Sequence, residues 1–360
     1  MKKKIALFIL ICVMLTGCEL IPAMSTVPPE TTAPAQTAYA TEPPTEAPTE
    51  VVYTNPLTGE PTDGPQESRI FAVTINNLQD AMPRVGVCLA DIYMEMYVND
   101  SIVRGLALYT DPSYVMRIGP VRSTRYMFTD LALHYNLIVA HAGGSSYVLN
   151  DIAVRGADEF NIDTQDSTYY SMRDMDRYKE NGYKGWEHCL FALGEGLAER
   201  AQEEGIDTSA DPQKDYLLHF REDGTPENGE DAVQIDLTLT YNESKKECGY
   251  VYDENVGRYV YWQYGTEMTD GLTGEKETYE NILIIFPYIK ANAYGYQEAD
   301  FVGGGSGYYA CGGKIVPITF GAEDEYSPLQ FFNADGSVLE LGVGRTFIAI
   351  TQEGSALSWS

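Results

Sequence analysis

The sequence has few basic residues. Of its 360 residues, 24 are Lys or Arg and 53 are Asp or Glu, which gives a formal net charge of -29 at pH 7. Nucleic-acid backbones bind basic protein faces, so this balance argues against nucleic acid as a partner. It also argues against broad adsorption onto anionic lipid, which attracts clusters of Lys and Arg. We expect the charge mainly to keep the folded protein soluble.

Metal-binding patterns are also missing. The sequence has six cysteines and four histidines, without CxxC or HExxH spacing and without an EF-hand loop. We therefore expect no metal site and no cofactor. Four cysteines lie beyond the N-terminal segment, namely Cys88, Cys189, Cys248 and Cys311. Disulfides among these four and separate buried thiols both remain open, and the sequence does not choose a pairing.

The apolar run at residues 5–15 is too short for a stable transmembrane span. Three lysines precede it at residues 2–4, and Leu-Thr-Gly-Cys follows at residues 15–18. This order is typical of a bacterial lipoprotein export signal with a lipobox that ends at Cys18. We therefore predict a signal peptide at residues 1–17 and a diacylglyceryl group on Cys18. The protein would then be extracytoplasmic and anchored to the cell membrane by its acyl chains.

The composition divides the rest of the chain into three parts. Residues 18–54 are rich in Pro and Thr and lack apolar periodicity, which predicts a lipid-anchored, disordered stalk. We predict an α/β N-terminal domain at residues 55–206. A β-rich C-terminal domain is predicted at residues 213–353, after a loop at residues 207–212.

Strand and helix patterns mix in the N-terminal domain, which predicts a mixed sheet with helices. Period-two or apolar runs predict strands at residues 70–75, 92–98, 102–109 and 137–140. Helices are expected from Pro120 to about Tyr135, from Ser145 or Ser146 to Gly156, and from His188 to about Ala201. A hairpin around Asn99-Asp100 would place Glu95 opposite Arg104. Residues 157–186 show little periodicity and are expected to be irregular.

The C-terminal domain is predicted to be mostly antiparallel β. Residues 233–241 alternate apolar and polar side chains, and residues 249–262 predict a hairpin. Further strands are expected at residues 281–286 and 345–351. Five tyrosines recur near the hairpin, namely Tyr250, Tyr252, Tyr259, Tyr261 and Tyr264. They reflect either β-propensity or an exposed strip that stacks against sugars or a peptide.

Several motifs resemble those of a known family. They are INN at residues 75–77, ADIYME at 90–95, RGLAL at 104–108, IGPVRS at 118–123, HAGGS at 141–145, GGGSGYY at 303–309 and DGSVLELGVGRTFI at 335–348. Together they resemble the YerB-like bacterial lipoproteins, a family of unknown function. The resemblance covers nearly everything after residue 55 and implies an α/β domain, a β domain and a lipid anchor. The chain departs from the family at Leu78, where His is frequent, and at Cys189, where Asn is frequent.

Two arginines near the start of the helix expected after Pro120 need a counter-charge. A helix N-terminus is already partly positive, so each of Arg122 and Arg125 there is unfavourable by roughly 0.3–1 kcal/mol. One interpretation is a structural ion-pair network of Asp91 and Glu95 with Arg104 and Arg122. The other is a cleft for a phosphate or carboxylate. The ligand-binding candidates are Arg122, Arg125, Arg104, Asn76, Gly143, Gly144 and Ser145.

The sequence contains no recognisable catalytic set. His141 precedes a glycine turn and could act as a general base, but a GxSxG motif is absent. His134 lies on an apolar helix face and is expected in the core. We therefore expect a non-catalytic binding or scaffold module whose partner is an anionic envelope ligand or another protein. The alternative is a cell-envelope hydrolase that acts on a glycan or phosphodiester through His141, Asp91 and Glu95. Whether the protein is an enzyme stays open.

Overall fold

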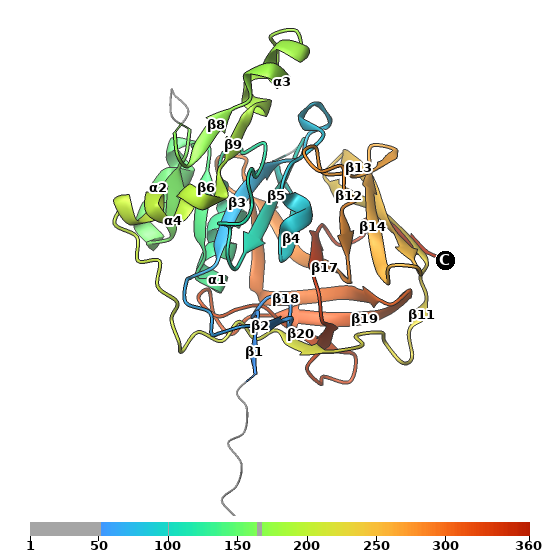
Figure 1. Cartoon of the computed structure of the whole chain (residues 1–360). Helices are drawn as coiled ribbons and strands as arrows, with labels where there is room; N and C mark the ends of the chain where they lie inside the picture. The colour runs from blue at the N-terminus through green and yellow to red at the C-terminus, as the bar shows by residue number, and fades with distance from the viewer. Residues whose placement is uncertain (1–51, 100, 164–167) are drawn as a thin grey trace, which may run out of the picture. The chain divides into compact units, whose positions relative to one another are not determined.

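The structure is a computed structural model that describes residues 52–99, 101–163 and 168–360 (Figure 1). The predicted signal peptide, Cys18 and nearly all of the predicted stalk lie outside the described residues. Regular structure begins with a hairpin of β1 (Tyr53–Thr54) and β2 (Pro61–Thr62), slightly before the boundary expected from composition. Residues 51–360 form one compact unit. Among the described residues, no helix is both long and apolar enough to cross a membrane.

The largest element is a mixed sheet of eleven strands. Its order is β11-β19-β18-β17-β22-β4-β5-β3-β6-β7, and β20 pairs with β19. The strands are β3 (Phe71–Asn76), β4 (Ile92–Asn99), β5 (Ile102–Tyr109), β6 (Ile138–His141), β7 (Asp158–Asn161), β11 (Glu230–Asp231), β17 (Asn281–Ala291), β18 (Gln297–Cys311), β19 (Lys314–Gly321), β20 (Gln330–Asn333) and β22 (Thr346–Ile350).

Both predicted regions of the chain contribute to this sheet. β22, near the end of the chain, pairs in parallel with β4, from Thr346 opposite Ile92 to Ile350 opposite Met96. β17 also pairs in parallel with β22, whereas β18 pairs antiparallel with both β17 and β19. The predicted fold class is therefore confirmed: an α/β region with a mixed sheet is followed by a mostly antiparallel β region. The sequence patterns did not indicate that strands of the two regions pair.

A second sheet of six strands belongs to the C-terminal region. It consists of β12 (Gln234–Tyr241), β13 (Ser244–Asp253), β14 (Arg258–Gln263), β15 (Thr266–Glu267), β16 (Thr278–Tyr279) and β23 (Leu357–Trp359). The predicted hairpin is confirmed, since β13 and β14 pair from Cys248 opposite Gln263 to Asp253 opposite Arg258. Side chains of β12 alternate between buried and less buried positions, as its period of two predicted.

Four helices accompany the sheets among the described residues. They are α1 (Tyr126–Tyr135), α2 (Ser146–Arg155), α3 (Met175–Glu180) and α4 (Gly194–Glu203). α3 lies with β8 (Ser171–Arg173) and β9 (Leu190–Ala192) in an arm at the top of Figure 1. The remaining elements are the 3-10 turns Gln79–Ala81, Val87–Leu89 and Trp186–His188, and the parallel pair β10 (His219–Arg221) and β21 (Glu340–Gly342).

The helix predictions hold in part. Ser145 caps α2 as expected, because its Oγ accepts a hydrogen bond from the Val148 amide at 3.3 Å. Gly156 ends the helix in the left-handed conformation, with φ of 71°. The helix expected from His188 begins only at Gly194. The intervening residues form β9, which pairs with β8, so strand pairing overrides the apolar helical spacing there.

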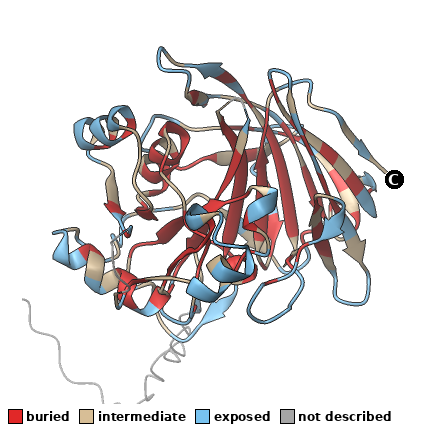
Figure 2. Ribbon diagram, turned by 90° about the horizontal axis from the view of Figure 1, so that it is seen from above, coloured by how far each residue is buried: buried red, intermediate tan, exposed pale blue. Residues whose placement is uncertain are grey.

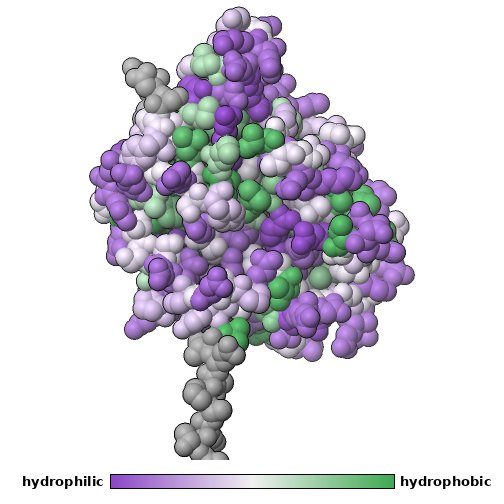
Figure 3. All heavy atoms as spheres, in the orientation of Figure 1, coloured by the Kyte–Doolittle hydropathy of each residue, from purple (hydrophilic) through white to green (hydrophobic). Residues whose placement is uncertain are grey.

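Each face of the mixed sheet covers a separate core. α1 packs its Met127, Phe128 and Leu131 on one face, against β4, β5 and β6. The six-stranded sheet covers the other face with aromatic side chains. The strands are buried along most of their length while the helices expose their outer sides (Figure 2). Hydrophobic side chains appear only in scattered patches on the molecular face in Figure 3, consistent with these two cores.

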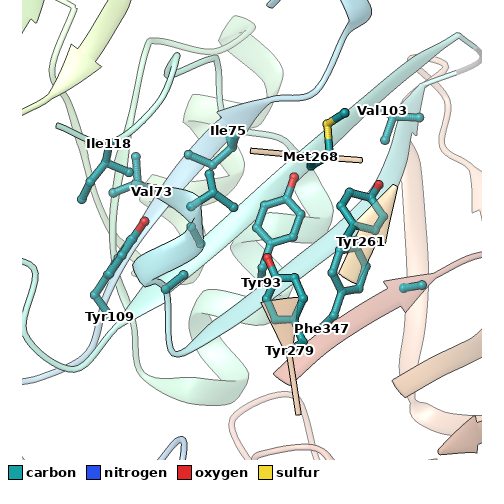
Figure 4. Close-up of a cluster of buried hydrophobic side chains, with 14 of the residues drawn as sticks. Val73, Ile75, Tyr93, Val103, Tyr109, Ile118, Tyr261, Met268, Tyr279 and Phe347 are labelled. Atoms are coloured by element: carbon teal, nitrogen blue, oxygen red, sulfur yellow. The ribbon is translucent and has the colours of Figure 1, made fainter. Parts of the chain in front are cut away.

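Tyrosines fill much of the core between the two sheets. Tyr93, Tyr250, Tyr261 and Tyr279 surround Phe347, with ring centroids 4.7–5.3 Å from its own. Tyr93, Tyr261 and Tyr279 are drawn around Phe347 in Figure 4. The idea of an exposed tyrosine strip on the hairpin is therefore wrong. Tyr250, Tyr259 and Tyr261 are fully buried, and Tyr252 and Tyr264 are partly buried.

Two buried ion pairs connect the N-terminal and C-terminal regions. Arg84 pairs with Glu277, and Lys246 pairs with Glu95. The Tyr261 hydroxyl also donates to Glu95 at 2.6 Å. Each pair joins a residue of the N-terminal region to a residue of the C-terminal region, so the pairs hold the two regions in one arrangement.

The expected pairing of Glu95 with Arg104 is wrong. In the observed register Arg104 lies opposite Met96, and Glu95 lies opposite Gly105. A bulge between Tyr97 and Asn99 shifts the register, and a shift of one residue moves a side chain to the other face of the sheet. Glu95 therefore points into the core between the sheets, whereas Arg104 lies on the α1 face.

The four cysteines within the described residues are separate buried thiols. Cys88, Cys189, Cys248 and Cys311 are all free, so none of the three possible disulfide pairings is present.

Candidate functional site

The candidate ligand-binding residues gather where three parallel strands end. Asn76 ends β3, His141 ends β6 and Asn161 ends β7. In open α/β sheets, ligands bind beyond the carboxyl ends of the strands. Residues 118–125 run between the ends of β3 and β6. The Arg122 amide donates to the Thr74 carbonyl at 3.1 Å, and the Arg122 carbonyl accepts from the Ala142 amide at 2.9 Å.

Residues 120–125 are not helical, although the sequence predicted a helix from Pro120. The Val121 amide donates to the Leu190 carbonyl at 2.7 Å, and the Arg122 amide is bonded to β3. These bonds occupy the backbone groups that a helix would need, so α1 begins only at Tyr126 with Arg125 as its N-cap. Arg122 is therefore not in the first turn, and the helix-dipole argument applies to Arg125 alone.

Three arginines form what we call the arginine cluster: Arg104, Arg122 and Arg125. Arg104 is 2% exposed and its Nη1 donates to the Ser123 carbonyl at 2.6 Å. Arg125 donates to the Thr124 carbonyl at 2.6 Å. The Nε atom of each of the three arginines is buried and has no hydrogen-bond partner within the described chain.

Electrostatics in the cluster are unfavourable. Burial lowers the pKa of Arg104 well below its ordinary value, and the charges of Arg125 and Arg122 lower it further. Burial also lowers the pKa of Arg122 and Arg125. Glu187 and Asp163 favour the charged form of Arg122 from a distance, but no carboxylate among the described residues forms an ion pair with any of the three arginines. The expected ion-pair network with Asp91 and Glu95 is therefore wrong, and within the described chain no ion pair neutralises the positive charge of the cluster.

Asn76 and His188 border the cluster. The Asn76 Nδ2 atom lies 2.7 Å from His188 Nδ1, and both residues are buried. Burial lowers the pKa of His188, and the charge of Arg122 lowers it too. His188 was not among the predicted site residues because it lies just after the irregular stretch. The one indication in the sequence was its neighbour Cys189, which occupies a position where the family often has Asn.

His141 lies against a carboxyl group that the sequence did not single out. Its Nε2 atom is 4.0 Å from Glu159 Oε2, and the Thr129 hydroxyl donates to Glu159 Oε1 at 3.0 Å. Burial lowers the pKa of His141 to about 4 and raises the pKa of Glu159 to about 7. At neutral pH the imidazole is therefore uncharged. Glu159 was missed because β7 lies in residues expected to be irregular.

Backbone groups of the glycine turn after β6 already form hydrogen bonds within the protein. The Gly143 amide donates to Asn161 Oδ1 at 3.0 Å, and the Gly143 carbonyl accepts from the Thr124 amide at 2.9 Å. Ser145 caps α2. The turn at residues 143–145 thus joins the ends of β6 and β7 to residues 118–125. The amide of Gly143 is already bonded within the chain.

The three catalytic candidates lie apart. Asp91 precedes β4, where it accepts hydrogen bonds from the Thr110 amide at 2.6 Å and from Asn55 at 3.0 Å. It borders a separate cavity of about 420 Å³. Glu95 lies between the two sheets, and His141 lies on the opposite face of the mixed sheet. The structure does not bring these residues into one site.

The described residues offer no candidate metal site. No group of three or more His, Cys, Asp or Glu side chains in this part of the chain is arranged to hold a metal ion. His134 is a core residue as predicted, because it is 2% exposed and its Nδ1 atom lies 2.6 Å from the Ser327 carbonyl.

Comparisons with known proteins agree with this architecture. Residues 57–207 match the family model described as protein of unknown function (DUF3048) N-terminal domain, and residues 237–348 match the model of its C-terminal domain. "Putative lipoprotein YerB" of Bacillus subtilis (strain 168) is 26% identical over 308 residues, which cover 85% of this chain and 88% of that protein. The crystal structure of YerB from Bacillus subtilis has the same fold, with a TM-score of 0.71 at 23% identity over 85% of this chain and 99% of that chain. The chain therefore belongs to the DUF3048 family of YerB-like proteins, whose function is unknown.

Proposed function

We propose that the protein is an extracytoplasmic lipoprotein, anchored through Cys18, that binds an anionic ligand without catalysis. The arginine cluster is the observation that carries this proposal. It holds three guanidinium groups at the carboxyl ends of parallel strands, and no described carboxylate pairs with them. The lipobox, and a relative whose name describes a lipoprotein, support the anchor.

The energetics of buried charge favour an anion as the missing partner. Moving a cation out of water costs several kcal/mol unless charges or hydrogen bonds compensate for it. A phosphate or carboxylate offers several acceptor oxygens, and its hydrogen bonds to guanidinium groups are roughly twice as strong as neutral ones. Asn76 and His188 would add uncharged polar groups at the edge of such a site.

The hydrolase alternative has less support. General acid–base catalysis requires its groups to lie within hydrogen-bond reach of one substrate. Asp91, Glu95 and His141 lie in three separate environments. His141 with Glu159 remains close to the arginine cluster, but His141 is only 3% exposed. We therefore assign this pair to the support of the site rather than to chemistry.

Thermal unfolding of the full-length protein in a non-ionic detergent tests the proposal. The probes are inorganic phosphate and citrate, compared with chloride at equal ionic strength. At 100 times its dissociation constant, a ligand stabilises the folded state by about 2.7 kcal/mol. We expect this stabilisation in the wild type and its loss in Arg122→Gln.

Arg200→Gln is the matched control, because Arg200 lies on α4 and pairs with the surface residue Glu203 at 3.2 Å. This variant should keep the stabilisation by anions. Equal stabilisation in all three proteins would show that the arginine cluster is not the binding site. No stabilisation by either probe would contradict the proposed function.

A further inference from the structure

A group of tyrosines adjoins the arginine cluster. Tyr126, Tyr147, Tyr294 and Tyr296 come from α1, from α2 and from the turn between β17 and β18, and we call them the tyrosine surface. The guanidinium of Arg125 lies over the Tyr296 ring, 5.6 Å from its centroid. The Tyr296 and Tyr126 ring centroids are 5.8 Å apart. The tyrosine surface therefore begins at the cluster itself.

The outer part of this surface is exposed. Tyr147 and Tyr294 stack with ring centroids 3.8 Å apart, and they are 49% and 55% exposed. The turn that carries Tyr294 is held by Asn292, whose Oδ1 accepts from the amides of Tyr294 and Tyr296 at 3.0 Å each. These rings are thus presented in a fixed arrangement, which reduces the entropy lost on binding.

A cavity of about 500 Å³ adjoins the same surface, a size typical of small-molecule sites. Its lining includes Tyr126, Tyr288, the cations Arg155 and Lys290, and a larger number of carboxylates, namely Asp130, Asp151, Glu298 and Asp300. Arg155 pairs with Asp130 at 2.6 Å and with Asp151 at 3.4 Å, and Lys290 lies 3.9 Å from Glu298, so these two cations neutralise part of the negative charge and leave the carboxylates in excess. Carboxylates accept hydrogen bonds from neutral hydroxyl groups and repel a second anion. The cavity therefore suits an uncharged, hydroxyl-rich group.

We propose that the ligand is an acidic glycan. Its anionic substituent would bind the arginine cluster, its sugar ring would pack on the tyrosine surface, and hydroxyl groups would reach the cavity carboxylates. Tyrosine suits such a ligand because its ring offers an apolar face and its hydroxyl a polar end. The carboxylates disfavour a ligand that is charged along its whole length. This inference rests on the proposed function and specifies its ligand class.

Calorimetry on the full-length protein with matched sugar pairs tests the inference. The pairs are N-acetylmuramic acid with N-acetylglucosamine, glucuronic acid with glucose, and glucose 6-phosphate with glucose. Inorganic phosphate and lactate serve as anions without a sugar ring. We expect at least one acidic sugar to bind about tenfold more tightly than its neutral counterpart and than either free anion, a difference of about 1.4 kcal/mol.

Substitutions separate the two parts of the site. Tyr294→Ala should weaken binding of the acidic sugar about fivefold, which is within the range measured for aromatic contacts. It should leave binding of phosphate unchanged. Arg122→Gln should weaken binding of both the acidic sugar and phosphate. Tyr183→Ala, a change at a 65% exposed tyrosine on the arm, should affect neither.

The failures are distinguishable. If no acidic sugar binds better than phosphate or lactate, or if Tyr294→Ala has no effect, the glycan inference is wrong while anion binding stands. If neither sugars nor free anions bind, the inference and the proposed function both fail.

Discussion

At the scale of single residues, the surroundings of Arg84 and Arg104 differ. Arg84 has the partners of a structural ion pair, whereas Arg104 is a candidate for binding a ligand. Burial lowers the pKa of Arg84, but Glu277, with smaller contributions from three neighbouring tyrosines, outweighs this effect and raises the pKa above its ordinary value. Arg84 also donates to Asn77 at 2.9 Å and to the Tyr93 hydroxyl at 2.5 Å. Arg104 is equally buried, yet its charged neighbours Arg125 and Arg122 lower its pKa further.

This contrast predicts that substitutions of Arg84 and Arg122 have different effects on the stability of the folded protein. Arg84→Gln leaves Glu277 buried without its partner, so the free energy of unfolding should fall by about 3–5 kcal/mol. Arg122→Gln removes a charge that forms no ion pair and repels its neighbours. Its effect should be within about 0.5 kcal/mol, or stabilising. Urea denaturation in chloride buffer measures both, and equal losses in the two variants would contradict the distinction.

The raised pKa of Glu159 predicts that the stability of the folded protein depends on pH. Its pKa is about 7 in the folded protein against 4.5 for an ordinary glutamate, because burial disfavours the carboxylate. Between these values the folded state keeps the proton that the unfolded state has lost. The contribution of Glu159 to stability is therefore present below pH 4.5 and declines as the pH rises towards 7.

Glu159→Gln does not titrate and isolates this effect. The stability of the wild type relative to the variant should decrease from pH 4.5 to pH 7 and then level off. Denaturation of both proteins at each pH provides the measurement. His141, whose pKa is about 4 in the folded protein, is present in both proteins and acts in the opposite direction on acidification, so it does not produce the predicted decrease. A constant difference would show that the pKa of Glu159 is not raised.

At the scale of elements, local patterns predicted α1, α2 and α4 and many of the longer strands, but neither the short strands nor which strands pair. The period of two identified β12 and the β13–β14 hairpin, and Ser145 and Gly156 marked the ends of α2. The pairing of β22 with β4 joins distant parts of the chain, and no local pattern contains that information.

The sequence did not predict β18, because the strand is rich in glycine. Gly303 to Gly307 interrupt the strand pattern, and glycines ordinarily indicate a turn or a bulge. Here they allow close approach of a neighbouring strand, because a Cβ at Gly305 would lie 2.4 Å from the Phe286 carbonyl oxygen. The strand therefore forms despite its composition.

The two sheets depend on the buried charges between them. Lys246→Met leaves Glu95 buried in the core with only the Tyr261 hydroxyl to bond it, so we expect a loss of about 3–5 kcal/mol in the free energy of unfolding. Adding Glu95→Gln removes the uncompensated charge and should restore part of that loss. Urea denaturation of the single and double variants measures the coupling. A double variant less stable than Lys246→Met would contradict this account.

At the scale of the whole molecule, one mixed sheet carries both regions, and the candidate site draws on both. Charge and motif reasoning selected Arg104, Arg122 and Arg125, and the structure brings these three together. Tyr296 arrives from a turn of the C-terminal region, and Glu159 comes from a strand with weak periodicity. These two could not be predicted because their relation to the arginines exists only in the folded chain.

The central claim is that the arginine cluster binds an anion, and a crystal structure with selenate tests it most directly. Selenium scatters anomalously, so the position of the anion is measured without assuming its identity. We predict an anomalous peak within hydrogen-bond distance of Arg104, Arg122 and Arg125 in the wild type and its loss in Arg122→Gln crystals grown under the same conditions. Selenate bound only at surface lysines, or an unchanged peak in the variant, would contradict the claim.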